Sequence, residues 1–384
     1  MFFKNKKQTV IKELVYDTTL EINLNNLIEN YRYFKSLIKP TTKIMAMVKA
    51  FSYGLGTYEV AQELEKLGVD YLGVANILEG VEIRKAGVKT PIMVMNPQAA
   101  SFNLMIAYKL SPVIFSLQNL NNFVKEVKKQ NPTNPNPIQI KFDTGMHRLG
   151  FNPDEISELV AILKANEKHV KVESIFSHLA ATDEPQQDAF THQQAELFEQ
   201  LSTNFTNQFN YPIDKHLLNT NGIIRFSEYQ YNMVRLGIGL YGVCADEKTQ
   251  QQLKIVSTLK TKISHLIKVK KGDTIGYNRK GIADADKVIA TIPMGYADGF
   301  NRLLSNGKWE VIVNNQKAPI IGNISMDMSM IDVTNIACNL GDEVIVFGKK
   351  NTISDMATRI KTIPYELFTI ISPRVKRVFY STNK

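Results

Sequence analysis

One lysine in this sequence lies where a buried strand is expected to end. Residues 44–48, IMAMV, are apolar and predict a strand buried on both faces, and Lys49 follows it at a turn that two glycines punctuate. An amine among apolar neighbours has a lowered pKa and becomes nucleophilic, as a Schiff base with an aldehyde cofactor requires. The same residues are equally compatible with a strand-end lysine that extends its amine to water.

Two polar clusters follow other predicted strands. The segment KFDTGMHRLG (141–150) includes Lys141 and Arg148, and FSHLAATDE places His178 directly after a strand-like run. A charged cluster of this kind is usually a solvated loop, and a lone histidine is more often structural than catalytic. The histidines show no metal-ligand spacing, so we predict no metal site.

Two later segments carry groups that suit a phosphate. HLLNTNG (216–222) and MVRLGIGLYG (233–242) contain the candidates Asn219, Thr220, Arg235, Gly237 and Ile238. A threonine hydroxyl can donate to phosphate, and glycines without side chains let backbone amides approach it closely. Glycines are also common in ordinary turns, so this signal is weak by itself.

The candidates in the last third of the chain lie in two short motifs. IPMGYADGF places Tyr296 on a turn, and IGNISMDMSMIDV contains Met326 and Asp327. Taken alone, the first is an ordinary turn and the second an apolar core strand.

The elements that must position these residues alternate regularly. Strand-like runs end near Lys49, Ala75, Met95, Ser116, Asp143, His178, Asn219 and Gly239, and most are separated by segments with helical periodicity. Eight strand–helix units predict an α/β fold, a parallel (β/α)8 barrel of the TIM type, with its functional groups where strands end. Thr18–Leu24 alternates like a strand that precedes the barrel.

The sequence pattern changes after about Cys244. Segments such as KVIATIPM, WEVIVNN and EVIVFG are short, β-rich and separated by turns, and they predict a mostly antiparallel second domain. We expect the barrel domain over residues 1–248 and the β-rich domain over residues 249–384.

Composition narrows the class of protein. The 384 residues are 44% apolar and 22% charged, which is typical of a globular protein of two domains. No long apolar run and no signal-like segment occurs, and two distant cysteines fit a reducing compartment, so we expect a cytoplasmic protein without membrane contact. The net charge of +9 is scattered over helix faces, so nucleic-acid binding is not expected.

The segment 44–56 resembles the pyridoxal-phosphate lysine motif of alanine racemase, in which a strand ends in Val-Lys-Ala and a Tyr-Gly pair follows. The resemblance extends from about Thr18 to Tyr380 through the segments quoted above. It implies a homodimer with shared active sites that interconverts L-alanine and D-alanine, supplying D-alanine for peptidoglycan, with pyridoxal 5'-phosphate as cofactor.

The resemblance also implies roles for individual residues. Lys49 would bind the cofactor's aldehyde and act as one base, and Tyr296 of the partner subunit would act as the second base on the opposite face of Cα. Arg148, Met326 and Asp327 would bind the substrate, and Lys141 would be carbamylated beside Arg148. The remaining cofactor-binding residues implied are Tyr53, His178, Asn219, Thr220, Arg235, Gly237 and Ile238.

Three positions depart from the family pattern or inform the chemistry. Leu55 replaces a common histidine, for which we expect only altered packing, and Pro373 replaces a tyrosine that contacts the phosphate and narrows the access channel. Arg235 would face the cofactor's ring nitrogen. An arginine cannot take up a proton, so this pairing favours an unprotonated ring and suits a reaction limited to moving one proton at Cα.

Three alternatives remain open. The first is a racemase of serine or of broader specificity, which Pro373 makes conceivable. The second is a barrel-type pyridoxal-phosphate amino-acid decarboxylase, against which the Tyr296 and Met326–Asp327 motifs speak. The third is a cofactor-binding or basic nucleic-acid-binding protein without catalysis, although cofactor-binding barrels of a single domain lack the β-rich domain.

Overall fold

The computed structural model describes residues 16–56 and 58–381. Within them the chain divides into two compact units. The barrel unit contains residues 22–56, 58–257, 364–369 and 379–381, and the β unit contains residues 16–21, 258–363 and 370–378. The domain boundary at residues 248 and 249 stays a prediction from the sequence.

The strands of the barrel unit close into a parallel barrel in chain order, as the alternation of strands and helices predicts. They are β2 (Lys43–Met47), β3 (Tyr71–Val74), β4 (Ile92–Val94), β5 (Ser111–Ile114), β6 (Asn136–Lys141), β7 (Val170–Phe176), β8 (Asp214–His216) and β9 (Met233–Leu236). Strand β2 pairs with both β3 and β9, which closes the sheet. The predicted TIM-type fold is therefore confirmed.

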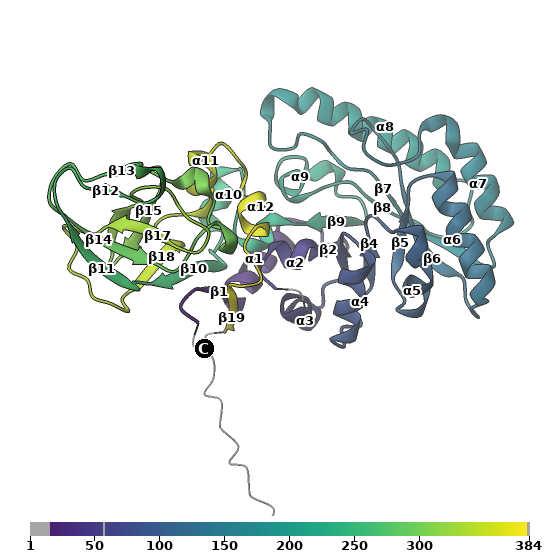
Figure 1. Cartoon of the computed structure of the whole chain (residues 1–384). Helices are drawn as coiled ribbons and strands as arrows, with labels where there is room; N and C mark the ends of the chain where they lie inside the picture. Colours follow the sequence, from purple (N-terminus) through teal and green to yellow (C-terminus); the bar gives the residue numbers. More distant parts are fainter. Residues whose placement is uncertain (1–15, 57, 382–384) are drawn as a thin grey trace, which may run out of the picture. The chain divides into compact units, whose positions relative to one another are not determined.

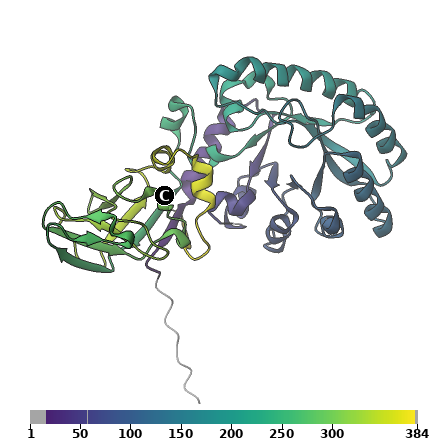
Figure 2. The same cartoon turned by 45° about the horizontal axis from the view of Figure 1, so that its top comes forward.

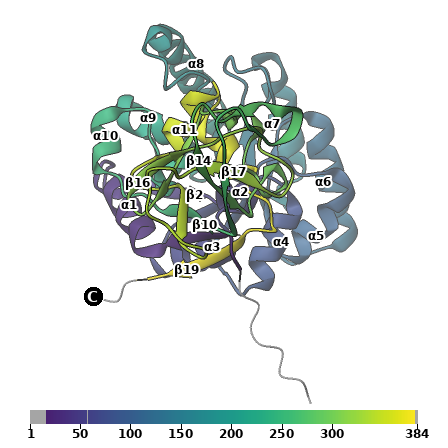
Figure 3. The same cartoon turned by 60° about the vertical axis from the view of Figure 1, so that its left-hand side comes forward.

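Helices cover the outside of the barrel (Figures 1 and 2). The helices of the barrel unit include α1 (Leu24–Ser36), α3 (Tyr58–Lys66), α4 (Ile77–Lys85), α5 (Phe102–Ala107), α6 (Leu117–Gln130), α7 (Ile156–Ala165), α8 (Asp188–Thr206), α9 (Thr220–Arg225), α10 (Glu247–Gln252) and α12 (Pro364–Thr369). Figure 3 shows α3, α4, α5 and α6 following one another around the barrel. The connections between strands thus keep the strand ends free for loops that carry side chains.

Local sequence explains where these helices begin and which face they bury. The side chains of Asn23 and Ser116 accept from backbone amides at the starts of α1 and α6, as good N-cap residues do. Helix α6 buries Leu120, Phe123 and Val127, whose spacing places them on one face. The core therefore lies between the strands and the inner faces of the helices.

The β unit is built from short, mostly antiparallel strands. One sheet has the order β16-β15-β18-β10-β1-β19, a second β11-β14-β17 and a third β12-β13. The strands are β1 (Thr19–Asn23), β10 (Ser257–Lys262), β11 (His265–Val269), β12 (Thr274–Ile275), β13 (Gly281–Ile282), β14 (Lys287–Ile292), β15 (Glu310–Val313), β16 (Gln316–Pro319), β17 (Ser329–Asp332), β18 (Glu343–Phe347) and β19 (Lys376–Tyr380), and α11 (Ile353–Arg359) follows β18. The predicted β-rich second domain is confirmed.

Two further features bear on the class of protein. Among residues 16–56 and 58–381, no helix has the length and apolar character needed to span a membrane. Cys244 and Cys338 are free thiols.

Candidate active site

Lys49 lies directly beyond the carboxyl end of β2 and begins an unusual turn. Ala50, Phe51, Ser52 and Tyr53 all have positive φ angles, between 49° and 57°, and form one left-handed turn, α2 (Lys49–Tyr53). Left-handed backbone costs about 1–2 kcal/mol for each residue that is not glycine. The turn ends at Gly54 (φ 83°), where an added Cβ would lie 2.1 Å from the Phe368 carbonyl oxygen.

Hydrogen bonds from Glu79 hold this strained turn in place. One carboxylate oxygen of Glu79 accepts from the Ala50 amide at 2.7 Å, and the other accepts from the Ala75 amide at 2.7 Å. Glu79 is also the third residue of α4, where it forms a capping box with Asn76. The turn after β2 is therefore tied to the loop after β3, which compensates part of its backbone strain.

The surroundings of Lys49 suit a nucleophile. Burial lowers the pKa of Lys49, and the positive charge of Arg148 lowers it further, while Glu79 acts in the opposite direction. No hydrogen bond occupies the Lys49 amine within the described part of the chain. A lysine with these properties carries more neutral amine at physiological pH than a surface lysine does.

The left-handed turn directs Tyr53 against Thr220 and Gly237. An added Cβ at Gly237 would lie 2.8 Å from the Tyr53 hydroxyl oxygen and 3.6 Å from Thr220 Oγ1. Thr220 Oγ1 accepts from the Gly237 amide at 3.0 Å. Burial raises the pKa of Tyr53, so its hydroxyl remains protonated and available as a donor. These groups form a small cradle of hydroxyl and amide groups.

Arg235 lies at the centre of the site, where it is buried and, among residues 16–56 and 58–381, has no acidic partner. Its NH1 donates to His216 Nδ1 at 2.7 Å, and its NH2 donates to the carbonyl oxygens of Ser177 and Leu217 at 2.8 and 2.7 Å and to His178 Nδ1 at 3.1 Å. Burial lowers the pKa of Arg235 to about 9, which still leaves it charged at neutral pH.

These contacts determine the tautomers of two histidines. A guanidinium can only donate, so both Nδ1 atoms that face Arg235 must be unprotonated acceptors. The neutral rings of His178 and His216 therefore carry their protons on Nε2. In agreement, burial and the Arg235 charge hold the pKa of each ring well below its usual range.

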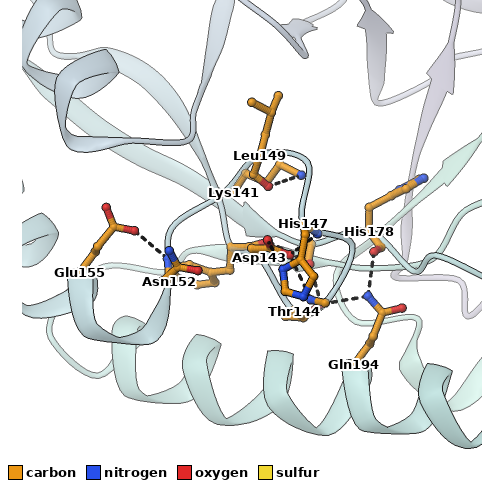
Figure 4. A network of polar contacts seen from close by, with 12 residues as sticks. Lys141, Asp143, Thr144, His147, Leu149, Asn152, Glu155, His178 and Gln194 are labelled. Carbon is orange, nitrogen blue, oxygen red and sulfur yellow. Dashed lines mark hydrogen bonds and ion pairs between the residues drawn. The ribbon is translucent and has the colours of Figure 1, made fainter.

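Figure 4 shows how Lys141 and its loop are fixed. The Lys141 amine donates to the Leu149 carbonyl oxygen, and Asp143 accepts from the amides of Gly145 and His147 at 3.0 Å. Burial and the Arg148 charge lower the pKa of Lys141 to about 8. The loop is thus rigid around Lys141.

His178 is anchored to the same region from helix α8. The Gln194 side chain donates to the His178 carbonyl oxygen at 3.2 Å and accepts from the Ala180 amide at 2.9 Å. Figure 4 shows Gln194 reaching from the helix toward His178 and Thr144. The backbone at His178 and Ala180 is therefore held by one side chain.

The barrel unit gathers most of the candidates around one cavity of about 510 Å³. The sequence-predicted residues that line it are Lys49, Tyr53, Lys141, Arg148, His178, Asn219, Thr220, Arg235 and Gly237. Ile238 is buried and is not among the lining residues. Asn219 also caps α9, where its side-chain oxygen accepts from the Gly222 amide at 2.9 Å.

The remaining candidates belong to the β unit, where two loops lie together. Tyr296 begins the turn η7 (Tyr296–Asp298), and its amide donates to the Ser325 carbonyl oxygen at 3.0 Å. Arg374 contacts both loops, with Nε 3.4 Å from Asp298 Oδ1 and NH2 2.9 Å from Asp327 Oδ1. The structure therefore brings Tyr296, Met326 and Asp327 together within the β unit.

Other residues that line the cavity were not candidates in the sequence, although Leu149 and Phe176 lie inside the segments 141–150 and 176–184 quoted above. They are Met47, Ala75, Met95, Asn96, Leu149, Phe176 and Tyr365. Tyr365 belongs to α12, and its ring centre lies 5.8 Å from that of Tyr53. Glu79 does not line the cavity but supports the turn at Lys49. Its position had a local signal in the sequence, because Asn76 and Glu79 have the spacing of a capping box.

No metal centre accompanies this cavity. Across residues 16–56 and 58–381, no group of three or more His, Cys, Asp or Glu side chains is arranged to hold a metal ion. The polar groups of the cavity are instead cations, hydroxyls, the carboxamides of Asn96 and Asn219, and the neutral His178, which together suit an anionic ligand.

A parallel barrel with a lysine at the end of its first strand, followed by a β-rich unit, defines a class of two-domain barrel enzymes, and comparisons with known proteins identify the family. The family model described as "Alanine racemase, N-terminal domain" matches residues 22–245, and the model described as "Alanine racemase, C-terminal domain" matches residues 256–379. Alanine racemase 1 of Caldanaerobacter subterraneus subsp. tengcongensis is 34% identical over 374 residues, and the alanine racemase of Clostridium novyi is 37% identical over 377 residues. Each alignment covers 95% of both chains.

Solved structures agree with this assignment. The alanine racemase of Clostridium difficile 630 has a TM-score of 0.90 at 33% identity, covering 97% of this chain and 98% of that one. The alanine racemase from Bartonella henselae, solved with covalently bound pyridoxal phosphate, has a TM-score of 0.85 at 28% identity, covering 95% of this chain and 100% of that one. The chain therefore belongs to the alanine racemase family, whose members are isomerases of the amino-acid racemase class.

Proposed function

We propose that this chain is a pyridoxal-phosphate-dependent racemase that interconverts L-alanine and D-alanine and supplies D-alanine for peptidoglycan in the cytoplasm. The observation that carries the proposal is the cavity that combines Lys49, whose pKa is lowered, with the cradle at Gly237 and the buried Arg235. Membership of the alanine racemase family supports it.

The donor set fits a phosphate at one end of the cavity. A Cβ at Gly237 would occupy the space beside the Tyr53 and Thr220 hydroxyls, so the missing side chain leaves room there for a ligand atom. Tyr53 has no hydrogen-bond partner for its hydroxyl among the described residues. We infer that Tyr53, Thr220 and the backbone at Gly237 and Ile238 hold the phosphate, with Asn219 fixing the start of α9.

The donor set also fits a neutral ring nitrogen beside Arg235. The Nε–H of Arg235 meets no acceptor within residues 16–56 and 58–381, whereas its NH1 and NH2 are occupied. Arg235 lines the cavity, so this free N–H is available to an acceptor on a ligand. His178 would lie against the ring, held by Arg235 at its Nδ1.

When bound, pyridoxal phosphate supplies an aldehyde that condenses with amines and a ring that delocalises the electron pair left at Cα. Lys49 would hold the cofactor through this aldehyde, and its amine, once released by the substrate, would take or return the proton at one face of Cα. The lowered pKa of Lys49 makes its neutral, basic form accessible near neutral pH.

Racemisation needs a second acid–base group on the opposite face of Cα. Among the side chains that line the cavity, His178 has its Nδ1 occupied by Arg235, and burial raises the pKa of Tyr53 and Tyr365, so none of these is well suited. We infer that Tyr296 of a second copy of this chain supplies it.

The surface around Tyr296 supports a homodimer. Tyr277, Tyr296, Met326 and Met328 are 70%, 44%, 53% and 52% exposed. Backbone bonds join the Tyr296 turn to Ser325 and Met326, and the Asn323 side chain donates to the Tyr277 carbonyl oxygen, so these side chains come from neighbouring loops. Clustered large apolar side chains at a surface indicate an interaction site.

The substrate carboxylate would be bound by Arg148 together with the Met326 backbone of the second copy, and Asp327 of that copy would belong to the same substrate-binding loop. We also propose that Lys141 is carbamylated. Its pKa of about 8 makes the neutral amine that reacts with CO2 accessible, and the resulting anion would pair with Arg148. The carbamate of Lys141 and the Arg148 guanidinium would then both be held in the hydrogen-bonded loop of residues 141–150.

Variants of the two bases test the proposal. Lys49→Ala should remove the visible absorption of the protein-bound cofactor, and Lys49→Arg, which keeps the charge but cannot condense with the aldehyde, should do the same. Tyr296→Phe should keep the absorption and lose racemisation, followed as decay of the circular dichroism of L-alanine. Tyr16→Phe is the control, because Tyr16 is 43% exposed against 44% for Tyr296.

The outcomes distinguish the alternatives. Racemisation that persists in Tyr296→Phe would remove the two-base assignment. Bound cofactor with no loss of the L-alanine signal, tested next with L-serine and for released CO2, would indicate a serine racemase or a decarboxylase. A wild-type protein that binds no cofactor would refute the proposed function at Lys49.

A further inference from the structure

A chain of polar side chains runs through the interior of the barrel from Arg235, which lines the cavity, to Ser111. Consecutive strands β5 to β9 each contribute one residue to it, namely Ser111, Gln139, Ser174, His216 and Arg235, and each is at most 4% exposed. The interior of such barrels is usually filled by bulky apolar residues. A polar chain in this place is tolerable only if every member is hydrogen-bonded.

The direction of the chain is fixed at the arginine end. Arg235 can only donate, so His216 Nδ1 accepts and His216 Nε2 carries the proton. Ser174 Oγ lies 2.9 Å from His216 Nε2 and must therefore accept from it. The Ser174 hydroxyl proton is then free to go to Gln139 Oε1, with which Ser174 forms a short hydrogen bond.

The far end demands the same direction. Gln139 Nε2 donates to Glu173 Oε2 at 2.8 Å and to Ser111 Oγ at 3.0 Å. An ionised carboxylate can only accept, so Glu173 fixes which way the Gln139 carboxamide faces. Arg235, which only donates, lies at one end of the chain, and Glu173, which only accepts, lies at the other. The imidazole, hydroxyl and carboxamide between them could each donate in either direction, and the two ends select one direction.

Ring stacking cannot replace this control over His216. The ring of His216 lies parallel to that of Phe176, at 4.7 Å between centres and 10° between planes. Stacking fixes the plane of the imidazole but not which edge faces Arg235, because a half-turn of the ring keeps the plane. The bonds at both nitrogens therefore decide the edge.

We propose that Ser174 and Gln139 are positioning residues, which hold the His216 ring and through it the Arg235 guanidinium. The effect on racemisation rests on the proposed function, since Arg235 would act on the cofactor's ring nitrogen. Loss of the chain leaves NH1 of Arg235 with a mobile acceptor, so the guanidinium shifts and its bond from NH2 to His178 weakens.

The test measures His178, which is separated from Ser174 by both His216 and Arg235. Full-length protein labelled with 15N-histidine gives imidazole nitrogen signals, assigned with His216→Gln and His178→Gln. In Ser174→Ala and Gln139→Met, the His178 Nδ1 signal should move toward that of an acceptor without a hydrogen bond. Ser174→Thr, which keeps the hydroxyl, should restore the wild-type signal.

The experiment includes a matched control variant and a milder variant. Ser202→Ala removes a fully buried hydroxyl on α8, outside the barrel interior, and should leave the His178 signal unchanged. Glu173→Gln removes the anion at the partly buried end of the chain while keeping an acceptor, so it should fold and give a smaller shift in the same direction. If Ser174→Ala does not fold, Glu173→Gln decides.

Kinetics separate this proposal from the proposed function. Ser174→Ala should lower kcat for L-alanine about tenfold at nearly constant KM. A change confined to His216, with the His178 signal unmoved in Ser174→Ala and Glu173→Gln, would overturn the positioning role. If the wild type does not racemise alanine but the His178 signal responds as expected, the proposed function fails and the positioning role stands.

Discussion

Gly237→Ala tests where a phosphate would bind, because the added methyl group enters the cradle itself. Its Cβ would lie 2.8 Å from the Tyr53 hydroxyl oxygen and 3.6 Å from Thr220 Oγ1. The first contact is a few tenths of an ångström too short for carbon and oxygen in van der Waals contact. The Tyr53 hydroxyl is the far end of its side chain and can yield by this amount, while its ring stays packed 4.8 Å from that of Tyr241 and 5.8 Å from that of Tyr365.

The expected loss follows from the hydrogen bonds that the methyl group blocks. A hydrogen bond to a charged group contributes about 1.5–3 kcal/mol. Displacing the phosphate from the Tyr53 and Thr220 hydroxyls removes two such bonds, so about 3–6 kcal/mol. At about 1.4 kcal/mol for each tenfold change, the Kd for pyridoxal phosphate should rise at least about a hundredfold.

Absorbance titration of protein freed of cofactor measures this Kd, and thermal melting measures stability with and without cofactor. Gly237→Ala should melt close to the wild-type temperature without cofactor, because its methyl group enters a cavity. Gly239→Ala provides the contrast, since its Cβ would lie 2.4 Å from the buried ring of Phe34. That variant should lose stability whether or not cofactor is present.

Wild-type affinity in Gly237→Ala would refute the cradle as the phosphate site. Equal destabilisation of Gly237→Ala in the absence of cofactor would show instead that the glycine serves packing. Only a loss of affinity without a loss of intrinsic stability agrees with the geometry.

Three further outcomes follow from the structure. Arg374→Ala should leave the melting temperature nearly unchanged, because Arg374 and Asp327 are exposed and the buried Asp298 also accepts from the Gly295 amide, yet lower kcat about tenfold by releasing the loops of Asp298 and Asp327; an unchanged kcat would contradict this. At fixed CO2 pressure, a 13C carbamate signal absent in Lys141→Met should grow from pH 6 to pH 8, since a pKa of about 8 leaves about a tenth of the amine neutral at pH 7. Asn219→Ala should cost about 1 kcal/mol of unfolding free energy by denaturant titration, and Asn219→Asp should cost less.

Much of the barrel could be predicted because each strand is a short run with its own turn signal. The apolar residues 44–48 indicate a buried strand whatever follows them, and the closed order of strands follows from repeated strand–helix units. Lys49 and Arg235 could be assigned to the same end of the barrel for this reason, since parallel strands bring their carboxyl ends together. The β-rich unit was likewise evident from its short strands and turns.

The left-handed turn at Lys49 could not be predicted, because none of the residues from Ala50 to Tyr53 favours positive φ. Its stability depends on Glu79, which is adjacent only in the folded barrel. The same limit explains why Tyr365 was missed, since it enters the cavity from α12, far along the chain. The polar chain through Gln139 could not be predicted for a similar reason, because each of the strands β5 to β9 contributes only one residue to it.

The charge at the centre of the site connects these features. Arg235 is buried without a carboxylate beside it, and burial lowers its pKa only to about 9, so it stays protonated at neutral pH. Its neighbours His178 and His216 are neutral and accept at Nδ1. A ligand atom on the Nε–H side of Arg235 therefore faces a hydrogen-bond donor and no proton acceptor. A pyridine nitrogen placed there keeps its lone pair and stays unprotonated, which limits how far it withdraws electrons. The same arrangement that denies Arg235 a carboxylate would therefore restrict the chemistry to proton transfer at Cα.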